Sequence, residues 1–249
     1  MSAPLFLMAS GLLAGSMNAL AGGGSFVTLP ALIASGVPSV MANATSSVAL
    51  YPGGVASAWV YRHGLGPVCR VPLPLMLAVT LSGGLAGALL LLWTPGAVFD
   101  RVLPLLLLLA TLMLVFAPKA GGWLRDHVTI GRPMILPMQF VLGLYGGYFG
   151  GAVGLMMIAA WSLLQGADIK ALNAPRTLMV TAANTVAIAC FAIAGAVAWR
   201  SALLVGLGAV AGGYAGAHLG RRLSPALVRM ATLALSALVT ASFFIRAYA

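Results

Sequence analysis

The sequence predicts an all-α, polytopic membrane protein, and three observations lead to this fold class. Hydrophobic residues fill 61% of the 249 positions and charged residues only 6%, whereas about 25% of the residues in a soluble domain are charged. Several apolar runs are long enough, at about 1.5 Å per helical residue, to cross a hydrocarbon core of about 30 Å. The connections between these runs are short and contain glycine, proline and basic residues.

The distribution of charge points to a lipid bilayer as the partner and argues against nucleic acid. The formal net charge of +10 arises from 13 Lys and Arg residues and 3 acidic residues. No stretch combines basic and aromatic side chains as a base-stacking surface requires. The basic residues instead lie in or beside the connections, where cytoplasmic loops of membrane proteins collect positive charge.

Glycine landmarks recur in the same order in two halves of the chain. The matching pairs are Gly15 with Gly143, Gly22-Gly23 with Gly150-Gly151, Asn43-Ala44 with Asn173-Ala174, and Gly83-Gly84-x-x-Gly87 with Gly212-Gly213-x-x-Gly216. One such pair could arise by chance, because glycine is frequent in membrane helices. The shared order indicates an internal duplication.

Each half opens with an apolar stretch that glycines interrupt. The pieces after the interruptions, Ser25–Ser35 and Leu155–Gln165, reach only about 17 Å as helices and cannot cross a bilayer alone. Each broken stretch either crosses once as a kinked helix or folds back as a hairpin. Hairpins place nine basic residues on one side and three on the other, whereas single crossings divide them seven against five. The positive-inside rule therefore favours hairpins. The nine are Arg62, Arg70, Lys119, Arg125, Arg132, Lys170, Arg176, Arg221 and Arg222, and the three are Arg101, Arg200 and Arg246.

The predicted organisation is two inverted repeats, each a glycine-broken helical hairpin plus three transmembrane helices. The first repeat covers residues 1–117, with a hairpin at 4–36 and spans at 43–62, 71–93 and 98–117. A cytoplasmic linker, 118–133, precedes the second repeat, 134–249, with a hairpin at 134–166 and spans at 174–195, 201–220 and 225–247. An odd number of crossings in each repeat inverts the second repeat relative to the first. This plan is frequent in secondary transporters.

The glycine interruptions are the first candidate site, because irregular backbone at membrane depth is tolerated only where it lines protein or a cavity. The candidate residues there are Gly23, Gly24, Ser25, Gly150 and Gly151. A helix that starts at such a break presents free amides and a positive dipole end, which suits an anion. We expect Ser25 to add a hydroxyl and cap its helix. The alternative is that these glycines only allow a tight reversal or close helix packing.

Polar side chains just after the two hairpins extend this candidate site. Amide and hydroxyl groups of Asn43, Thr45, Asn173 and Thr177 can donate to an oxyanion, although both asparagines could instead cap helices. Thr181 and Asn184 continue this polar line.

Three further side chains have two interpretations each. Arg176 could clamp an anion bidentately or extend to the headgroups. Tyr145 could present its hydroxyl to a cavity or anchor at the interface. Asn18 could face the same cavity or satisfy backbone freed by the turn.

Several motifs of other function classes are missing from the sequence. It contains no Gly-rich phosphate loop ending in Lys-Ser or Lys-Thr, no metal-ligand cluster of His and Cys, and no nucleophile with a plausible base. We therefore expect no enzyme activity, no cofactor and no metal. Asp100, Asp126 and Asp168 are predicted to lie in loops, which leaves no intramembrane carboxylate to relay protons or neutralise a cation.

The chain resembles the TauE/SafE sulfite exporter family at motifs spread over almost its whole length. These are Gly15-Ser16-x-Asn18-Ala19-x-Ala21-Gly22-Gly23-Gly24-Ser25, Leu29-Pro30, Gly36-Val37-Pro38, Ala42-Asn43-Ala44-Thr45, Leu172-Asn173-Ala174-x-Arg176-Thr177, Gly195 with Trp199, and Gly212-Gly213-x-x-Gly216 before Arg221-Arg222. The resemblance implies an inner-membrane permease for sulfite or organosulfonate anions.

These observations together predict a multi-pass transporter of the inner (plasma) membrane that moves a small anion by alternating access. Sulfite or a related organosulfonate is the first expectation for the substrate. A permease for another small organic acid anion and a non-transporting membrane scaffold or assembly factor stay open as alternatives, as does a homodimer.

Overall fold

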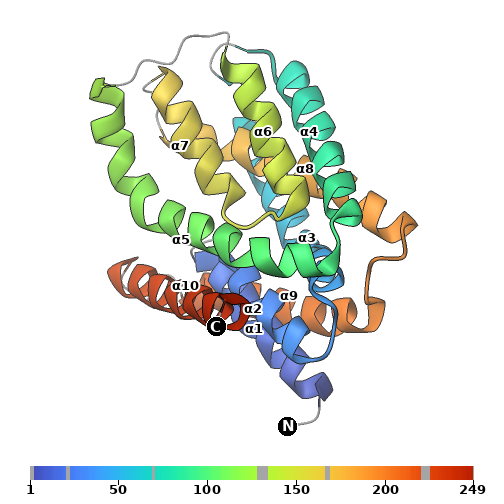
Figure 1. Ribbon diagram of the computed structural model, residues 1–249. Coiled ribbons are helices and arrows are strands. Elements are labelled where there is room, and N and C mark those ends of the chain that lie inside the picture. The colour runs from blue at the N-terminus through green and yellow to red at the C-terminus, as the bar shows by residue number, and fades with distance from the viewer. Residues whose placement is uncertain are drawn as a thin grey trace. The chain divides into compact units, whose positions relative to one another are not determined.

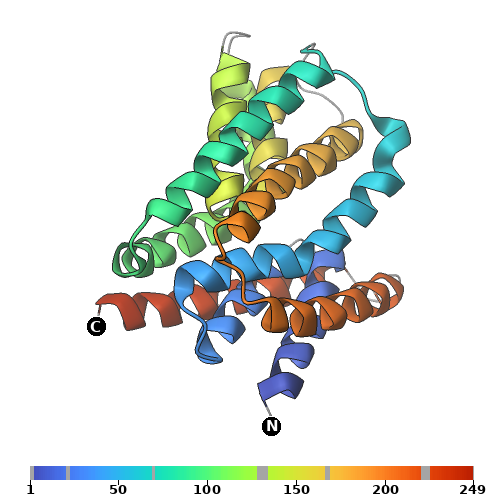
Figure 2. The same ribbon diagram turned by 90° about the vertical axis from the view of Figure 1, so that its right-hand side faces the viewer.

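A computed structural model describes residues 3–20, 23–68, 71–127, 134–165, 169–219 and 225–248 (Figures 1 and 2). The regular structure of this part is helical, apart from one 3-10 turn at Arg62–Gly64 and an isolated bridge between Val68 and Val71. The helices are α1 (Ala3–Leu20), α2 (Ser25–Ala34), α3 (Ser39–Tyr61), α4 (Leu73–Trp93), α5 (Gly96–His127), α6 (Ile135–Tyr148), α7 (Val153–Gln165), α8 (Ile169–Ile193), α9 (Trp199–Leu219) and α10 (Pro225–Tyr248). The predicted all-α fold class is confirmed.

Four helical segments in the described ranges are long and apolar enough to cross a membrane. They are Leu73–Trp93, Gly96–Phe116, Leu172–Ile193 and Arg229–Tyr248. Large apolar side chains are also turned outward, among them Ile193 and Trp93, which are 88% and 77% exposed. Outward-facing apolar side chains on such helices fit a lipid environment, since lipid tails solvate them.

Several helix bounds differ from the expected ones. Helix α5 continues to His127, ten residues into the segment expected as a linker, and it contains Asp100, which is exposed on the helix rather than in a loop. Helices α3 and α8 begin at Ser39 and Ile169. Asn43 and Asn173 therefore lie one turn inside these helices and cannot be their N-caps.

The chain reverses at both glycine interruptions. In the first, a methyl group added to Gly24 would lie 2.9 Å from the carbonyl oxygen of Ala14, although ten residues of straight helix would separate them by about 15 Å. In the second, α6 and α7 lie side by side and are joined at one end by a tight turn (Figure 1). Gly150 and Ala152 have positive φ angles of 76° and 58° there. Both glycine-broken stretches thus fold as helical hairpins.

The chain forms two compact units, and each draws on both halves of the sequence. Unit 1 comprises Met1–Gly53, Leu92–Thr111 and Phe191–Ala249, and unit 2 comprises Gly54–Leu91 and Leu112–Cys190. The hairpin α1/α2 therefore shares a unit with α9 and α10. The hairpin α6/α7 shares the other unit with α4, most of α8 and the end of α5. The inverted orientation of the two repeats stays a prediction.

In unit 1 the hairpin helix α1 packs directly on α9, which lies beside it in Figure 2. Glycines make this approach so close that a methyl group on Gly212 would overlap the carbonyl oxygen of Leu12. A methyl group on Gly15 would overlap that of Ala209 in the same way. Ser16 Oγ adds a hydrogen bond of 2.9 Å to the carbonyl oxygen of Gly212. The backbones of the two helices therefore touch.

Unit 2 repeats these contacts between α6 and α4. A methyl group on Gly83 or Gly87 would overlap the carbonyl oxygen of Phe140 or Leu144, and one on Gly143 would meet that of Thr80 at 2.8 Å. These are the positions that the glycine landmarks align with Gly212, Gly216 and Gly15 of unit 1. The duplicated sequence pattern thus corresponds to a duplicated pattern of backbone contacts.

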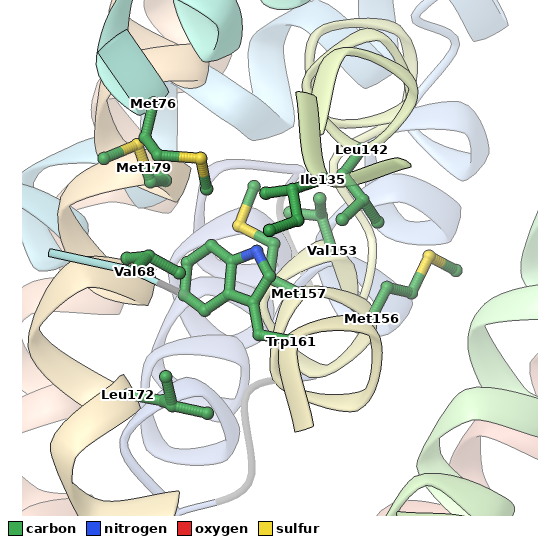
Figure 3. Packing of buried hydrophobic residues seen from close by; sticks show 10 residues of the cluster. All are labelled: Val68, Met76, Ile135, Leu142, Val153, Met156, Met157, Trp161, Leu172 and Met179. Carbon is green, nitrogen blue, oxygen red and sulfur yellow. The ribbon is translucent and has the colours of Figure 1, made fainter. Parts of the chain in front are cut away.

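The core of unit 2 surrounds Trp161, a fully buried side chain of α7 (Figure 3). Its apolar neighbours in the buried cluster are Val68, Met76, Ile135, Leu142, Val153, Met156, Met157, Leu172 and Met179. The indole Nε1 donates to Gln139 Oε1 at 3.0 Å, and Gln139 Nε2 donates to Thr80 Oγ1 at 2.7 Å. All three side chains have no exposed surface, so losing one partner would leave a buried polar group unsatisfied, at a cost of about 1–3 kcal/mol.

The close backbone approach in unit 1 can be tested with two adjacent glycines. Gly212→Ala should lower the unfolding temperature in detergent by several degrees, because overpacking typically costs about 1–3 kcal/mol. Gly213 is the matched control, since a methyl group there would have its nearest neighbour, the Gly15 oxygen, at 3.8 Å. Gly213→Ala should be neutral or stabilising, because alanine is the better helix former. Equal effects of the two substitutions would contradict the packing described.

Candidate functional site

The turn between α6 and α7 in unit 2 presents backbone donors that the described part of the protein does not use. Phe149 N and Gly150 N both donate to the carbonyl oxygen of Tyr145, at 2.9 and 3.1 Å. The next bonded amides are those of Leu155 and Met156, which donate to Ala152. Among the described residues, no acceptor contacts the amides of residues 151–154. These amides lie at the N-terminus of α7, where the helix dipole is positive and favours an anion.

Arg176 of α8 lies against this turn. A methyl group on Gly154, the second residue of α7, would lie 3.3 Å from Arg176 Cδ and 3.5 Å from Val180 Cγ2. The absence of a side chain at Gly154 therefore leaves room for the arginine stem beside the first turn of α7. Arg176 is half-buried, and within the described ranges it has no hydrogen-bond or ion-pair partner.

Asn184 reaches the other end of the same turn. It lies two helical turns after Arg176 on α8, and its Oδ1 would be 3.7 Å from a methyl group on Gly150. Its Nδ2 donates to the carbonyl oxygen of Val180 at 3.0 Å. The face of α8 that carries Arg176, Val180 and Asn184 thus runs along the turn of Gly150–Gly154.

Tyr145 contributes a buried hydroxyl to unit 2. Its Oη has no hydrogen-bond partner among the described residues, and its ring meets the Phe149 ring edge-on at 6.0 Å. The Phe149 ring in turn occupies the space beside Gly151, 2.5 Å from where a methyl group would be. A buried hydroxyl without a partner is rare in proteins and calls for a ligand, water or strain to account for it.

Asn173 and Thr177 lie on the first turns of α8, near Arg176 in sequence. Thr177 Oγ1 donates to the carbonyl oxygen of Asn173 at 2.7 Å. The hydroxyl proton of Thr177 is therefore used within the helix, and only its acceptor lone pairs stay available. Asn173 is half-buried.

The corresponding turn in unit 1 bonds part of its donors internally. The amide of Gly24 donates to Asn18 Oδ1 at 3.2 Å, and Phe26 N donates to the Gly23 carbonyl at 3.1 Å. Val27 N and Thr28 N both donate to the Gly24 carbonyl, at 3.0 and 3.1 Å. Asn18 thus satisfies backbone freed by the turn, which was one of its two predicted roles.

The predicted cap at Ser25 is wrong. The N-cap of α2 is Gly24, which has helical φ and ψ angles of −57° and −33°, and Ser25 is already the first helical residue. A serine inside the first turn cannot act as the cap, because a capping side chain belongs to the residue before the helix.

Other polar side chains of unit 1 also bond within the protein. Thr45 is fully buried, and its Oγ1 accepts from the amide of Ala198 at 3.0 Å, just before α9 begins. Thr28 Oγ1 and Ser46 Oγ are 2.5 Å apart. Asn43 is 3% exposed, and its backbone carbonyl oxygen accepts a hydrogen bond from Ser47 Oγ at 3.1 Å. These groups are therefore engaged in hydrogen bonds within unit 1.

Acidic groups are scarce around the unit 2 turn. Asp100 belongs to unit 1, and Asp168 and the side chain of Asp126 lie outside what the structure describes. The described groups at this turn are an arginine, amides and an asparagine. Such a set binds anions rather than cations.

Comparison with known proteins places this architecture among membrane transporters. The family described as sulfite exporter TauE/SafE matches residues 7–243. A probable membrane transporter protein of Escherichia coli K12, YfcA, is 31% identical over 88% of this chain and 79% of its own length. A probable membrane transporter protein of Haemophilus influenzae is 29% identical over 94% of this chain and 92% of its own length. No solved structure matches. The chain therefore belongs to the TauE/SafE sulfite exporter family of membrane transporters.

Proposed function

We propose that this membrane transporter is a secondary transporter that moves a small oxyanion by alternating access across the inner (plasma) membrane. Sulfite is the substrate that we propose first, and a related organosulfonate second. The observation that carries the proposal is the position of Arg176 of α8 against the first turn of α7. Among the described residues Arg176 has no hydrogen-bond or ion-pair partner, and no acceptor contacts the four amides of residues 151–154 beside it.

The geometry suits an anion with several oxygen atoms. The guanidinium can donate to two oxygens at once, while the amides of a helix N-terminus bind a further oxygen. Sulfite and the sulfonate group each present three oxygens on one sulfur, and so can use both kinds of donor together. In this proposal the buried hydroxyl of Tyr145 is a secondary contact. Asn184 can contribute only the second hydrogen of its Nδ2, because the first is donated to Val180.

The coupling that we propose follows from the charges at this turn. No carboxylate of the described residues lies there to relay a proton, and the sequence has no nucleotide-binding loop. The anion therefore moves down its own gradient or carries its proton with it.

A permease for another small organic acid anion is the alternative within the same site, because arginine binds carboxylates as well as sulfonates. The second alternative, a membrane scaffold, is favoured by one feature of unit 1, where Asn18 and Gly23 accept hydrogen bonds from two amides of the turn. A scaffold would bind no anion at either turn. Whether the protein is a homodimer does not enter the proposed chemistry.

Substitution of Arg176 tests the proposed site. Arg176→Ala should raise the sulfite concentration for half-maximal uptake into proteoliposomes at least about tenfold, since hydrogen bonds to charged groups contribute roughly 1.5–3 kcal/mol. Arg176→Lys should recover part of the affinity, because lysine keeps the positive charge but lacks the paired N–H donors of the guanidinium. Arg62→Ala is the matched control, since Arg62 is exposed and stacks on Trp59 at 4.2 Å. If the Arg176→Ala protein has the same half-saturating sulfite concentration as the wild type, the proposed site is wrong.

Imposed gradients test the proposed coupling. A voltage that is positive on the receiving side should accelerate sulfite uptake into proteoliposomes, because the anion carries the charge that crosses. A pH gradient should change the rate when the substrate carries a proton. The same flux should persist when sodium is replaced by potassium or choline. A strict requirement for sodium would contradict the proposed coupling.

A further inference from the structure

A buried chain of polar side chains ties the hairpin α6/α7 to two other helices of unit 2. Trp161 of α7 bonds to Gln139 of α6, and Gln139 bonds to Thr80 of α4. The Thr80 hydroxyl lies 2.7 Å from the carbonyl oxygen of Met76 and 3.1 Å from Met179 Sδ on α8. One amide side chain, Gln139, therefore stands at the centre of contacts among four helices.

Gln139 is placed to satisfy both of its neighbours at once. Its Oε1 accepts from the indole, and its Nε2 donates to the threonine. No apolar side chain of the same size could do either. Because all three side chains are fully buried in an apolar cluster, water cannot replace a lost bond.

Unit 1 has the same contacts between helices without these hydrogen-bonded polar side chains. The glycine landmarks align Gln139 with Gly11 and Thr80 with Ala209. At the first of these positions, α1 and α9 approach through bare backbone, since a methyl group on Gly11 would overlap the carbonyl oxygen of Val205. Formation of the hairpin and its packing on a long helix therefore do not require the polar chain. The hydrogen-bonded side chains occur in the unit that holds Arg176 and the turn of Gly150–Gly154.

The polar chain also joins the elements that form the proposed site. Trp161 lies on α7, whose first turn carries the free amides, and Met179 lies on α8, less than one turn after Arg176. We propose that Gln139 is a positioning residue, which holds α7 against α8 so that its first turn and Arg176 meet one anion together. This inference rests on the proposed function.

The test measures sulfite uptake into proteoliposomes by purified full-length variants. Gln139→Met removes both hydrogen bonds with little change in volume. It should raise the half-saturating sulfite concentration about fivefold to tenfold, equivalent to roughly 1–1.4 kcal/mol, with a smaller change in maximal rate. Trp161→Phe removes the indole donor of the first bond and keeps the bond between Gln139 and Thr80, so it should give a smaller shift in the same direction. It also serves as the second variant in case Gln139→Met does not fold.

Thr111→Val is the matched control for the loss of a buried hydrogen bond. Thr111 Oγ1 lies 3.0 Å from Thr240 Oγ1 inside unit 1, whereas the residues of the proposed site belong to unit 2. Thr111→Val should lower the unfolding temperature while leaving the half-saturating concentration unchanged. If the Gln139 and Trp161 variants behave like this control, their role is structural only and the inference is wrong.

A double variant separates the inference from the proposed function. If Gln139 acts through Arg176, adding Gln139→Met to Arg176→Ala should not raise the half-saturating concentration further. Independent, additive effects would overturn the inference while leaving the site intact. If Arg176→Ala alone leaves the half-saturating sulfite concentration at the wild-type value, the proposed function is overturned instead.

Discussion

Direct contact between helix backbones is the constraint on which the rest of this structure depends. Lipid tails are as apolar as leucine, so helices in a bilayer associate through close packing rather than through the hydrophobic effect. Here the close approach is made at glycines, between α1 and α9 in unit 1 and between α4 and α6 in unit 2. Each hairpin helix is thereby fixed in register, and the turn at its end is held in place.

The sequence predicted the hairpins from two signals together. The glycines marked where the apolar stretches are interrupted, and the distribution of basic residues favoured a reversal over a single kinked crossing. The sequence did not predict which helices would share a unit. The match of Gly83 with Gly212 shows that the two positions are alike, but not that Gly83 packs on α6 and Gly212 on α1. The bounds of α3 and α8 were also missed, because Asn43 and Asn173 resemble caps, although each lies one turn inside its helix.

The site was predicted as a feature shared by both halves, and the structure shows a difference between them. In unit 1 the side chain of Asn18 accepts a hydrogen bond from the Gly24 amide. In unit 2 the amides of residues 151–154 have no such partner among the described residues. Gly154 was absent from the predicted site residues, and Asn184 was noted only as continuing the polar line after the second hairpin. The available signal was the spacing of Arg176, Val180 and Asn184, which places them on one face of α8. The contact of that face with the turn is tertiary and has no sequence signature.

Amide hydrogen exchange at the α6/α7 turn tests the central claim most directly. The account states that the amides of residues 151–154 are the donors for a small oxyanion, with Arg176 beside them. Exchange of peptides that contain this turn should slow when sulfite is added to the purified protein, and the turn at Gly23–Ser25, whose Gly24 amide is already bonded to Asn18, should change little. Unchanged exchange at residues 151–154 under saturating sulfite, or protection only at Gly23–Ser25, would contradict the account.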